Sequence, residues 1–422
     1  MTVALLVSAR IPGPAGGPLY LSALGVASVV YLIAVREFTR TPKYPRHVLF
    51  VCLLMAAGWR IPFLLVQPGP QDDVLRYVWD GRLQRLGYNP YTAIPADPAL
   101  AKLHTQETRE MNNPDLPSPY PPGAQLFFRA ITAIHESAFA FKVAFAACDL
   151  AIVLLLLADL PWSGRGEHWA LTYAWHPLLV PCVAYNGHID ILGALLLLIS
   201  AISLRRHWRA LAAITFAMAV AVKFLPAVLA PLYWRRLRIR DGLLAALVIG
   251  LLYAPFINRG TIPIGSLSIF IRRFRFNDPV FDLIARATLP QAAAGFAVLS
   301  GLLLAVWIRS RWPVPSPDAW AWPMAVSLAG APVVYPWYLL WLVPFLDSAA
   351  TLPLMVWTVS ILPVFSVWYS YAFGGPWQVP DWILLLEYGP VTLAALIHLF
   401  RRRMLAAAYM PGSEHEGGVS RE

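Results

Sequence analysis

Hydrophobic residues in this chain form long runs, separated by short polar segments, from Pro18 to Phe400. A helix needs about 20 apolar residues to cross the hydrocarbon core of a bilayer, and many of these runs approach that length. Prolines such as Pro226, Pro336 and Pro344 end the shorter runs, which is typical of kinked or broken membrane helices. The pattern predicts an all-α, polytopic transmembrane helical bundle with about 11 to 13 spans.

Composition and charge agree with a membrane protein. Of 422 residues, 58% are hydrophobic and only 13% are charged, too few charges to cover a soluble protein of this size. The formal net charge is +10, but the basic residues form short clusters between apolar runs, so they indicate topology and no nucleic-acid partner. Cys52, Cys148 and Cys182 lie in apolar segments without metal-ligand spacing, and we expect neither a disulfide framework nor a zinc site.

The basic clusters also predict how the chain is oriented. Placing them inside puts the N-terminus outside and the C-terminus inside, with two external loops, 67–122 and 258–288. We expect one transmembrane domain, 1–408, a flexible cytoplasmic tail, 409–422, and no removable signal peptide in Met1–Arg10. Arg272, Arg273 and Arg275 fall outside, against the charge rule, so either the topology fails there or these arginines have an anionic partner.

The first external loop carries polar residues at helical spacing. Asp73, Arg76, Tyr77 and Asp80 lie at i, i+3, i+4 and i+7 and therefore share one face of a helix. Aromatic and leucine side chains would give that helix an apolar side, as expected of an interfacial helix resting on the membrane. Its carboxylates can serve as a general base or bind a divalent metal. Alternatively, Asp73 and Arg76 form a surface ion pair and Asp72 caps the helix.

Three polar features lie further along the chain. Tyr120 precedes two prolines that turn the chain into a short apolar helix, Ala124–Ile134. His188 and Asp190 occupy a tight turn between two spans, where they can orient a sugar or phosphate or simply stabilise the turn. Lys223 interrupts an apolar run, so it either reaches the membrane boundary or binds an anion.

Two further segments mix aromatic residues with polar ones or with proline. Arg272 and Arg273 alternate with phenylalanines, which suits either a lipid phosphate or general attraction to anionic headgroups. Tyr335 and Trp337 flank a proline at a broken helix. They can anchor the chain at the membrane boundary or stack on a sugar ring.

The loop motifs, in their order, resemble a known superfamily. They read Asp73-x-x-Arg76-Tyr77-x-Trp79-Asp80-Gly81, then Gly87-x-Asn89-Pro90-Tyr91, then Tyr120-Pro121-Pro122. They are similar to the GT-C superfamily of polyprenyl-phosphate-sugar-dependent glycosyltransferases, most of all to the bacterial family-87 type, which includes mannosyltransferases of actinobacterial lipoglycans. The likeness extends through Asn186–Asp190, Lys223–Pro226 and Pro332–Trp341.

This resemblance implies an inverting glycosyltransferase in the plasma or inner membrane, with its active site on the external or periplasmic face. It would move a hexose, with mannose favoured, from a polyprenyl-phosphate donor to a lipid or glycan acceptor. Asp73 would be the general base, with Asp72 as the second choice. Candidates for binding the donor phosphate are Arg76, Lys223, Arg272 and Arg273. Candidates for binding sugar or acceptor are Tyr77, Asp80, Asn89, Tyr91, Tyr120, His188, Asp190, Tyr335 and Trp337. No cofactor is implied, because a lipid-linked donor does not demand the divalent metal that Asp72 and Asp73 could bind.

Two other functions fit a polytopic chain. A transporter or flippase of a lipid-linked or small polar substrate should show inverted repeats and polar residues at mid-membrane depth in both halves. The sequence shows no such repeat, and its polar motifs fall toward one face. A non-catalytic subunit of an envelope assembly would not need the loop carboxylates. The sequence leaves the oligomeric state open.

Overall fold

The computed structural model describes residues 16–41, 43–69, 71–257, 263–311, 316–346 and 349–408. The segment Met1–Arg10 and the tail 409–422, for which we made predictions above, lie outside these described residues. The described chain is helical: it contains no β-strand and a single isolated bridge, between Phe276 and Val333. The prediction of an all-α fold is confirmed.

Seven helical segments of the described chain are long and apolar enough to cross a membrane, so the protein is a multi-pass membrane protein. They comprise α2 (Gly16–Arg40), α3 (Arg46–Leu64), α6 (Ala138–Asp159), α11 (Ile239–Tyr253), α14 (Pro290–Arg311), α16 with α17 (Leu352–Ser360 and Ser366–Ala372) and α18 (Asp381–Ala408). Their outward side chains are apolar: on α11, Leu243, Leu247 and Leu251 are all more than half exposed. Such a surface is stable in lipid and not in water.

The remaining α-helices are shorter than the shortest membrane-crossing segment, which has 18 residues and extends α11 to Phe256. They are α4 (Asp73–Arg85), α5 (Pro122–Ile134), α7 (Ala170–Ala174), α8 (Asp190–Arg205), α9 (Arg209–Val222), α10 (Ala230–Tyr233), α12 (Leu267–Arg273), α13 (Pro279–Ala287) and α15 (Pro317–Ala329). Short 3-10 helices at Leu225–Leu229, Pro336–Trp341 and Val343–Phe345 contain the prolines that predicted broken helices. The spans predicted beyond seven correspond to such short or broken helices.

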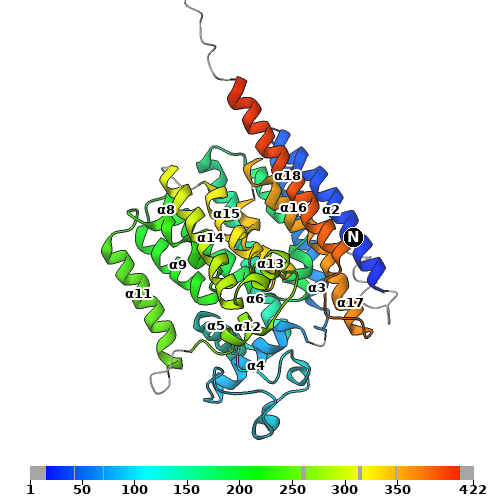
Figure 1. Cartoon of the computed structure of the whole chain (residues 1–422), viewed down its shortest axis with the longest axis vertical. Helices are drawn as coiled ribbons and strands as arrows, with labels where there is room; N and C mark the ends of the chain where they lie inside the picture. Colours follow the sequence, from blue (N-terminus) through cyan, green and yellow to red (C-terminus); the bar gives the residue numbers. More distant parts are fainter. Residues whose placement is uncertain are drawn as a thin grey trace, which may run out of the picture.

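The α4 helix is packed within the protein at one end of the helical bundle. Tyr77, Trp79 and Leu83 are fully buried, and Trp79 stacks on His104 of the same loop at a ring distance of 3.9 Å. The expectation that these apolar side chains rest on the membrane surface is therefore wrong. They pack against the protein instead, because α5 covers one part of α4, where Phe128 stacks on Tyr77 at 4.5 Å, and the rest of the 67–122 loop covers another part. Figure 1 shows α4 with this loop at one end of the molecule, below α5 and α12.

The two loops predicted to lie on the same side of the membrane contact each other. Asn89 Nδ2 donates to the carbonyl oxygen of Phe256 at 3.1 Å, and Ser266 Oγ donates to the carbonyl oxygen of Pro117 at 3.0 Å. These bonds join the first loop to the segment that follows α11. Residues far apart in the sequence are thereby brought to one end of the helical bundle.

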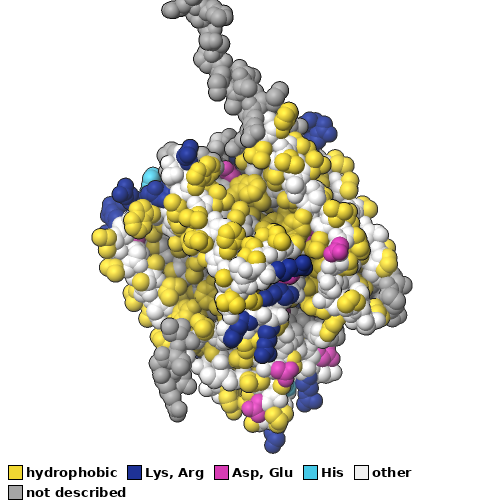
Figure 2. All heavy atoms as spheres, viewed as in Figure 1, with side chains coloured by type: hydrophobic (Ala, Val, Ile, Leu, Met, Phe, Trp, Pro, Cys, Tyr) yellow, Lys and Arg dark blue, Asp and Glu magenta, His cyan; other side chains and the backbone are white. Residues whose placement is uncertain are grey.

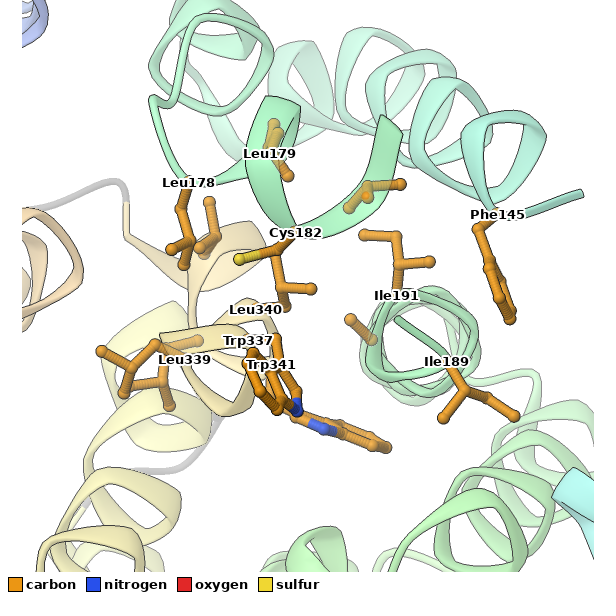
Figure 3. Close-up of a cluster of buried hydrophobic side chains, with 14 of the residues drawn as sticks. Phe145, Leu178, Leu179, Cys182, Ile189, Ile191, Trp337, Leu339, Leu340 and Trp341 are labelled. Atoms are coloured by element: carbon orange, nitrogen blue, oxygen red, sulfur yellow. The ribbon is translucent and has the colours of Figure 1, made fainter. Parts of the chain in front are cut away.

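A continuous apolar core supports this end of the bundle. Figure 3 shows Trp337 and Trp341 directed from the Pro336–Trp341 segment toward the start of α8, where Ile189 and Ile191 lie. Ile189, Ile191 and Trp341 are all buried. Gly193 on α8 lies against the Trp341 ring, and a side chain there would collide with it. This glycine lets α8 and the Pro336–Trp341 segment approach closely.

Candidate active site

A cavity of about 440 Å³ lies between the first loop, α12, α14 and α15. Its polar part is lined by Asp73, Asp190, Lys223, Tyr120, Tyr335 and Trp337. Its apolar part is lined by α12, through Phe270 and Phe274, and by small or aliphatic residues of α14 and the end of α15. The cavity therefore suits a ligand with a polar head and an apolar tail.

Asp73 begins α4 and faces the polar part of the cavity. Its Oδ1 accepts a hydrogen bond of 2.6 Å from Asn112 Nδ2, while Oδ2 lies 3.5 Å from His188 Nδ1, a distance typical of an electrostatic contact. Burial would raise the pKa of Asp73, but nearby His188, the Asn112 amide and the Lys223 ammonium outweigh burial and hold that pKa below its usual range. The carboxylate is therefore ionised at neutral pH and able to accept a proton.

Asp72 has a different environment from its neighbour. It does not line the cavity, and its Oδ2 accepts a hydrogen bond of 2.7 Å from the Gly69 backbone amide. Burial, helped by the charge of Asp73 and opposed by the Gly69 hydrogen bond, raises the pKa of Asp72 to about 7. Of the two candidate bases, Asp73 alone lines the cavity.

Lys223 and Asp190 form an ion pair at the cavity wall. Lys223 Nζ lies 2.7 Å from Asp190 Oδ1 and 3.5 Å from the centre of the Tyr338 ring. Trp341 Nε1 donates to the same Asp190 oxygen at 2.7 Å. The lysine follows the last residue of α9, where the chain leaves the helix in an extended conformation. It therefore presents its ammonium to the cavity without being an unpaired charge.

His188 lies behind this wall and not in the lining. Its ring stacks on Trp337 at 3.9 Å and an interplanar angle of 9°, and Trp337 stacks in turn on Tyr335 at 4.5 Å. The imidazole is 2% exposed, and neither ring nitrogen has a hydrogen-bond partner in the described part of the chain. His188 is therefore placed to act on Asp73 and Trp337, and it does not reach a sugar in the cavity directly.

Arg76 and Asp80 form a buried ion pair with an Nε–Oδ1 distance of 3.0 Å. Arg76 also donates to the backbone oxygens of Asn113 and Leu116, at 3.4 and 2.9 Å. Asp80 is fully buried and absent from the cavity lining, with its Oδ2 bonded to Ser118 and Gln125. The expectation that Asp80 binds sugar is therefore corrected. Arg76 borders the cavity, but its guanidinium is already used to hold the loop.

Asn89 and Tyr91 also hold the loop and do not line the cavity. The Tyr91 hydroxyl donates to the carbonyl oxygen of Tyr120 at 2.7 Å, and the Tyr91 backbone amide donates to Asn89 Oδ1 at 3.0 Å. Their predicted contact with sugar is corrected to a supporting role. Tyr77 and Tyr120, in contrast, both border the cavity, with their rings edge to face at 5.1 Å.

Arg272 and Arg273 are exposed on the outer side of α12 and do not line the cavity. Arg272 Nε donates to the Ser268 carbonyl oxygen at 3.2 Å within its own helix. The opposite side of α12 forms the cavity wall, so these two arginines point away from it. Their expected contact with the donor phosphate inside the cavity is therefore corrected.

Sequence reasoning missed Asn112, the side chain bonded to Asp73. It lies 39 residues further along the chain, within a turn-rich stretch that carries no spacing pattern pointing to Asp73. Only the folding of the loop brings the two side chains together. As for a metal, no group of three His, Cys, Asp or Glu side chains converges within the described residues. The expectation that no metal is required stays a prediction.

Comparisons with known proteins gave one similar structure and one family match. The crystal structure of ArnT from Cupriavidus metallidurans bound to undecaprenyl phosphate is similar over 85% of this chain and 71% of that one, with 15% sequence identity and a TM-score of 0.43. No curated protein matches the chain. Residues 13–236, more than half of the chain, match the family model of the alpha-(1->6)-mannopyranosyltransferase N-terminal domain. The chain thus belongs to the alpha-(1->6)-mannopyranosyltransferase family, and it is a membrane glycosyltransferase.

Proposed function

We propose that the enzyme transfers mannose from a polyprenyl-phosphate donor to a hydroxyl of a lipid or glycan acceptor, with inversion at the anomeric carbon. The observation that carries this proposal is the shape of one cavity, which places the Asp73 carboxylate at the polar end of an apolar groove. A lipid-linked sugar is the kind of donor whose two parts match such a cavity. The choice of mannose rests on the family to which the chain belongs.

Asp73 is the general base of this proposal. Asn112 holds Oδ1, and Oδ2, which lies 3.5 Å from His188 Nδ1, is the oxygen that would meet the acceptor hydroxyl. As the acceptor oxygen forms its bond to the anomeric carbon, Oδ2 takes the hydroxyl proton. The bond from the anomeric carbon to the phosphate oxygen breaks at the same time, and the phosphate keeps the electron pair. A low pKa makes Asp73 a modest base, and that suffices because a phosphate is already a good leaving group.

An inverting, single-displacement reaction agrees with the environment of Asp190, the other carboxylate that lines the cavity. Retaining glycosyl transfer uses a carboxylate nucleophile, and Asp190 is already bound by Lys223 and by Trp341. Lys223 lines the same cavity as Asp73, its charge acts on the Asp73 carboxylate, and it would meet the departing phosphate. A preorganised charge of this kind stabilises the transition state without any reorganisation cost.

The membrane side follows from the same proposal. The Asp73 end of the cavity lies among the two loops that charge distribution places outside, so we infer catalysis on the external or periplasmic face of the plasma or inner membrane. The acceptor would approach past Asn112 and Asn113, at the end of the cavity formed by the first loop.

The test is a transfer assay with the purified full-length protein and a panel of polyprenyl-phosphate sugars, with products identified by mass. We expect transfer from the mannosyl donor. Asp73→Asn should insert and accumulate normally but transfer about 10²- to 10⁴-fold more slowly, the usual contribution of a general base. Asp72→Asn is the matched control and should keep most of the activity. Full activity in Asp73→Asn would remove Asp73 as the base.

A further inference from the structure

The outer face of α12 carries two arginines that have no acidic partner among the described residues. Figure 2 shows Lys and Arg side chains gathered over the region where Figure 1 places α12 and α13. Of the arginines there, Arg275 lies 3.8 Å from Asp278, and Arg286 lies 2.6 Å from Asp282. Arg272 and Arg273 are exposed, and neither is paired with a carboxylate in the described part of the chain. The surface formed by α12 and α13 therefore has two positive charges that no carboxylate compensates.

This surface lies at a membrane boundary. α12 and α13 follow α11 and directly precede α14, and both of these flanking helices are long and apolar enough to cross a membrane. The segment is also bonded to the first loop through Ser266, so it lies at the Asp73 end of the molecule.

Apolar side chains of the same segment, between α12 and α14, are exposed as well. Leu283 is 70% exposed and Leu289 is 71% exposed. A segment that exposes both leucines and arginines is poorly suited to hydrocarbon, where the guanidinium groups would lose their hydration, and in water its leucines would stay in contact with solvent. The headgroup region of a bilayer satisfies both: acyl chains contact the leucines while phosphates accept hydrogen bonds from the guanidinium groups.

We propose that Arg272 and Arg273 form a docking surface for the phosphate groups of anionic phospholipids, which hold α12 against the bilayer. This proposal goes beyond sugar transfer and accounts for the basic cluster that opposes the charge rule, because the cluster has an anionic partner. The inner face of α12 contributes Leu267, Phe270 and Phe274 to the cavity, so the bound lipid would support one wall of the active site from outside. The occupant is a bilayer phospholipid and not the donor, since both arginines point away from the cavity.

The test measures lipid binding and needs no sugar transfer. The full-length protein in detergent is titrated with phosphatidylglycerol or phosphatidylcholine, and bound lipids are counted by native mass spectrometry. We expect wild type to prefer phosphatidylglycerol. Arg272→Gln/Arg273→Gln should bind it about 30-fold more weakly, since each basic residue near an anionic surface contributes about fivefold, or 1 kcal/mol. Arg286→Gln is the matched control, because its guanidinium already has a carboxylate partner and its loss should change binding little.

Three results would overturn the proposal. They are equal binding of the two lipids by wild type, phosphatidylglycerol binding by the double variant at wild-type strength, and an equal loss in Arg286→Gln. If the double variant bound phosphatidylglycerol normally but bound a polyprenyl phosphate more weakly, the surface would serve the donor, and the proposal would also fail. Because the assay contains no acceptor or sugar, its outcome is separate from that of the proposed transfer reaction.

Discussion

Replacement of Gly193 by alanine should damage the active site from a distance. The added Cβ would lie inside contact distance of the Trp341 ring. Trp341 is fully buried within the hydrophobic core, so a shift of its ring requires neighbouring side chains to move as well. Its Nε1 donates to Asp190 Oδ1, the oxygen that also holds Lys223. The methyl group should therefore displace the ring, weaken that hydrogen bond and shift the ion pair at the cavity wall.

Two effects determine how much stability and transfer rate the Gly193→Ala variant should lose. Forcing an extra carbon into a packed interior costs about 1–3 kcal/mol of stability. A hydrogen bond to a charged group contributes about 1.5–3 kcal/mol. If that loss falls on the transition state, transfer should slow about 10- to 150-fold, since about 1.4 kcal/mol corresponds to a factor of ten.

The assay combines thermal unfolding in detergent with the rate of sugar transfer. Gly250→Ala is the matched control, because an added Cβ there meets nothing within 4 Å and Gly250 also lies inside an apolar helix. In the Gly193→Ala background, Trp341→Phe should recover stability but not activity, because the smaller ring relieves the collision and has no N–H for Asp190. If Gly193→Ala matched Gly250→Ala in both measurements, the reasoning about Trp341 would be refuted.

Three further predictions concern the first loop and its neighbours. A general base acts only when it is deprotonated. Because the pKa of Asp73 is lowered, kcat/KM for transfer should stay level as the pH falls through 7. A decline in kcat/KM centred near pH 7 would indicate that the base is Asp72, whose pKa is raised to about 7. Asp80→Ala leaves a buried guanidinium unpaired and should lower the free energy of unfolding by about 3–5 kcal/mol; a loss below about 0.5 kcal/mol, as at a surface site, would contradict the buried network. His188→Asn places an amide near Nδ1 and should retain more kcat than His188→Phe, which preserves only the stacking on Trp337; the reverse order would show that the ring and not its nitrogen matters.

Several elements follow from local sequence alone. Apolar runs of sufficient length predict the membrane-crossing helices, because lipid requires every backbone polar group to be satisfied within the helix. Tyr120 and the two prolines after it predict the start of α5, and Pro336 predicts the broken helix that carries Trp337. The loop motifs also predict the glycosyltransferase family, which the match over residues 13–236 confirms.

The roles of individual charged residues do not follow from local sequence. Asp73 and Asp80 lie on the same face of α4, about two helical turns apart, yet Asp73 faces the cavity and Asp80 is fully buried. Arg76 was expected at the phosphate but holds the loop, and Arg272 was expected there but faces outward. Spacing shows which side chains share a face, while distant chain segments decide what covers that face.

The sequence by itself determined a polytopic helical membrane protein, a glycosyltransferase family and a carboxylate pair at the start of α4. Only the tertiary structure decided which carboxylate meets the cavity, that Asn112 holds it, and that Lys223 pairs with Asp190. The physical reason is the sequence separation of the interacting residues. Helix formation in lipid depends on neighbouring residues, whereas burial, hydrogen-bond partners and the pKa difference between Asp72 and Asp73 depend on side chains brought together from distant parts of the chain.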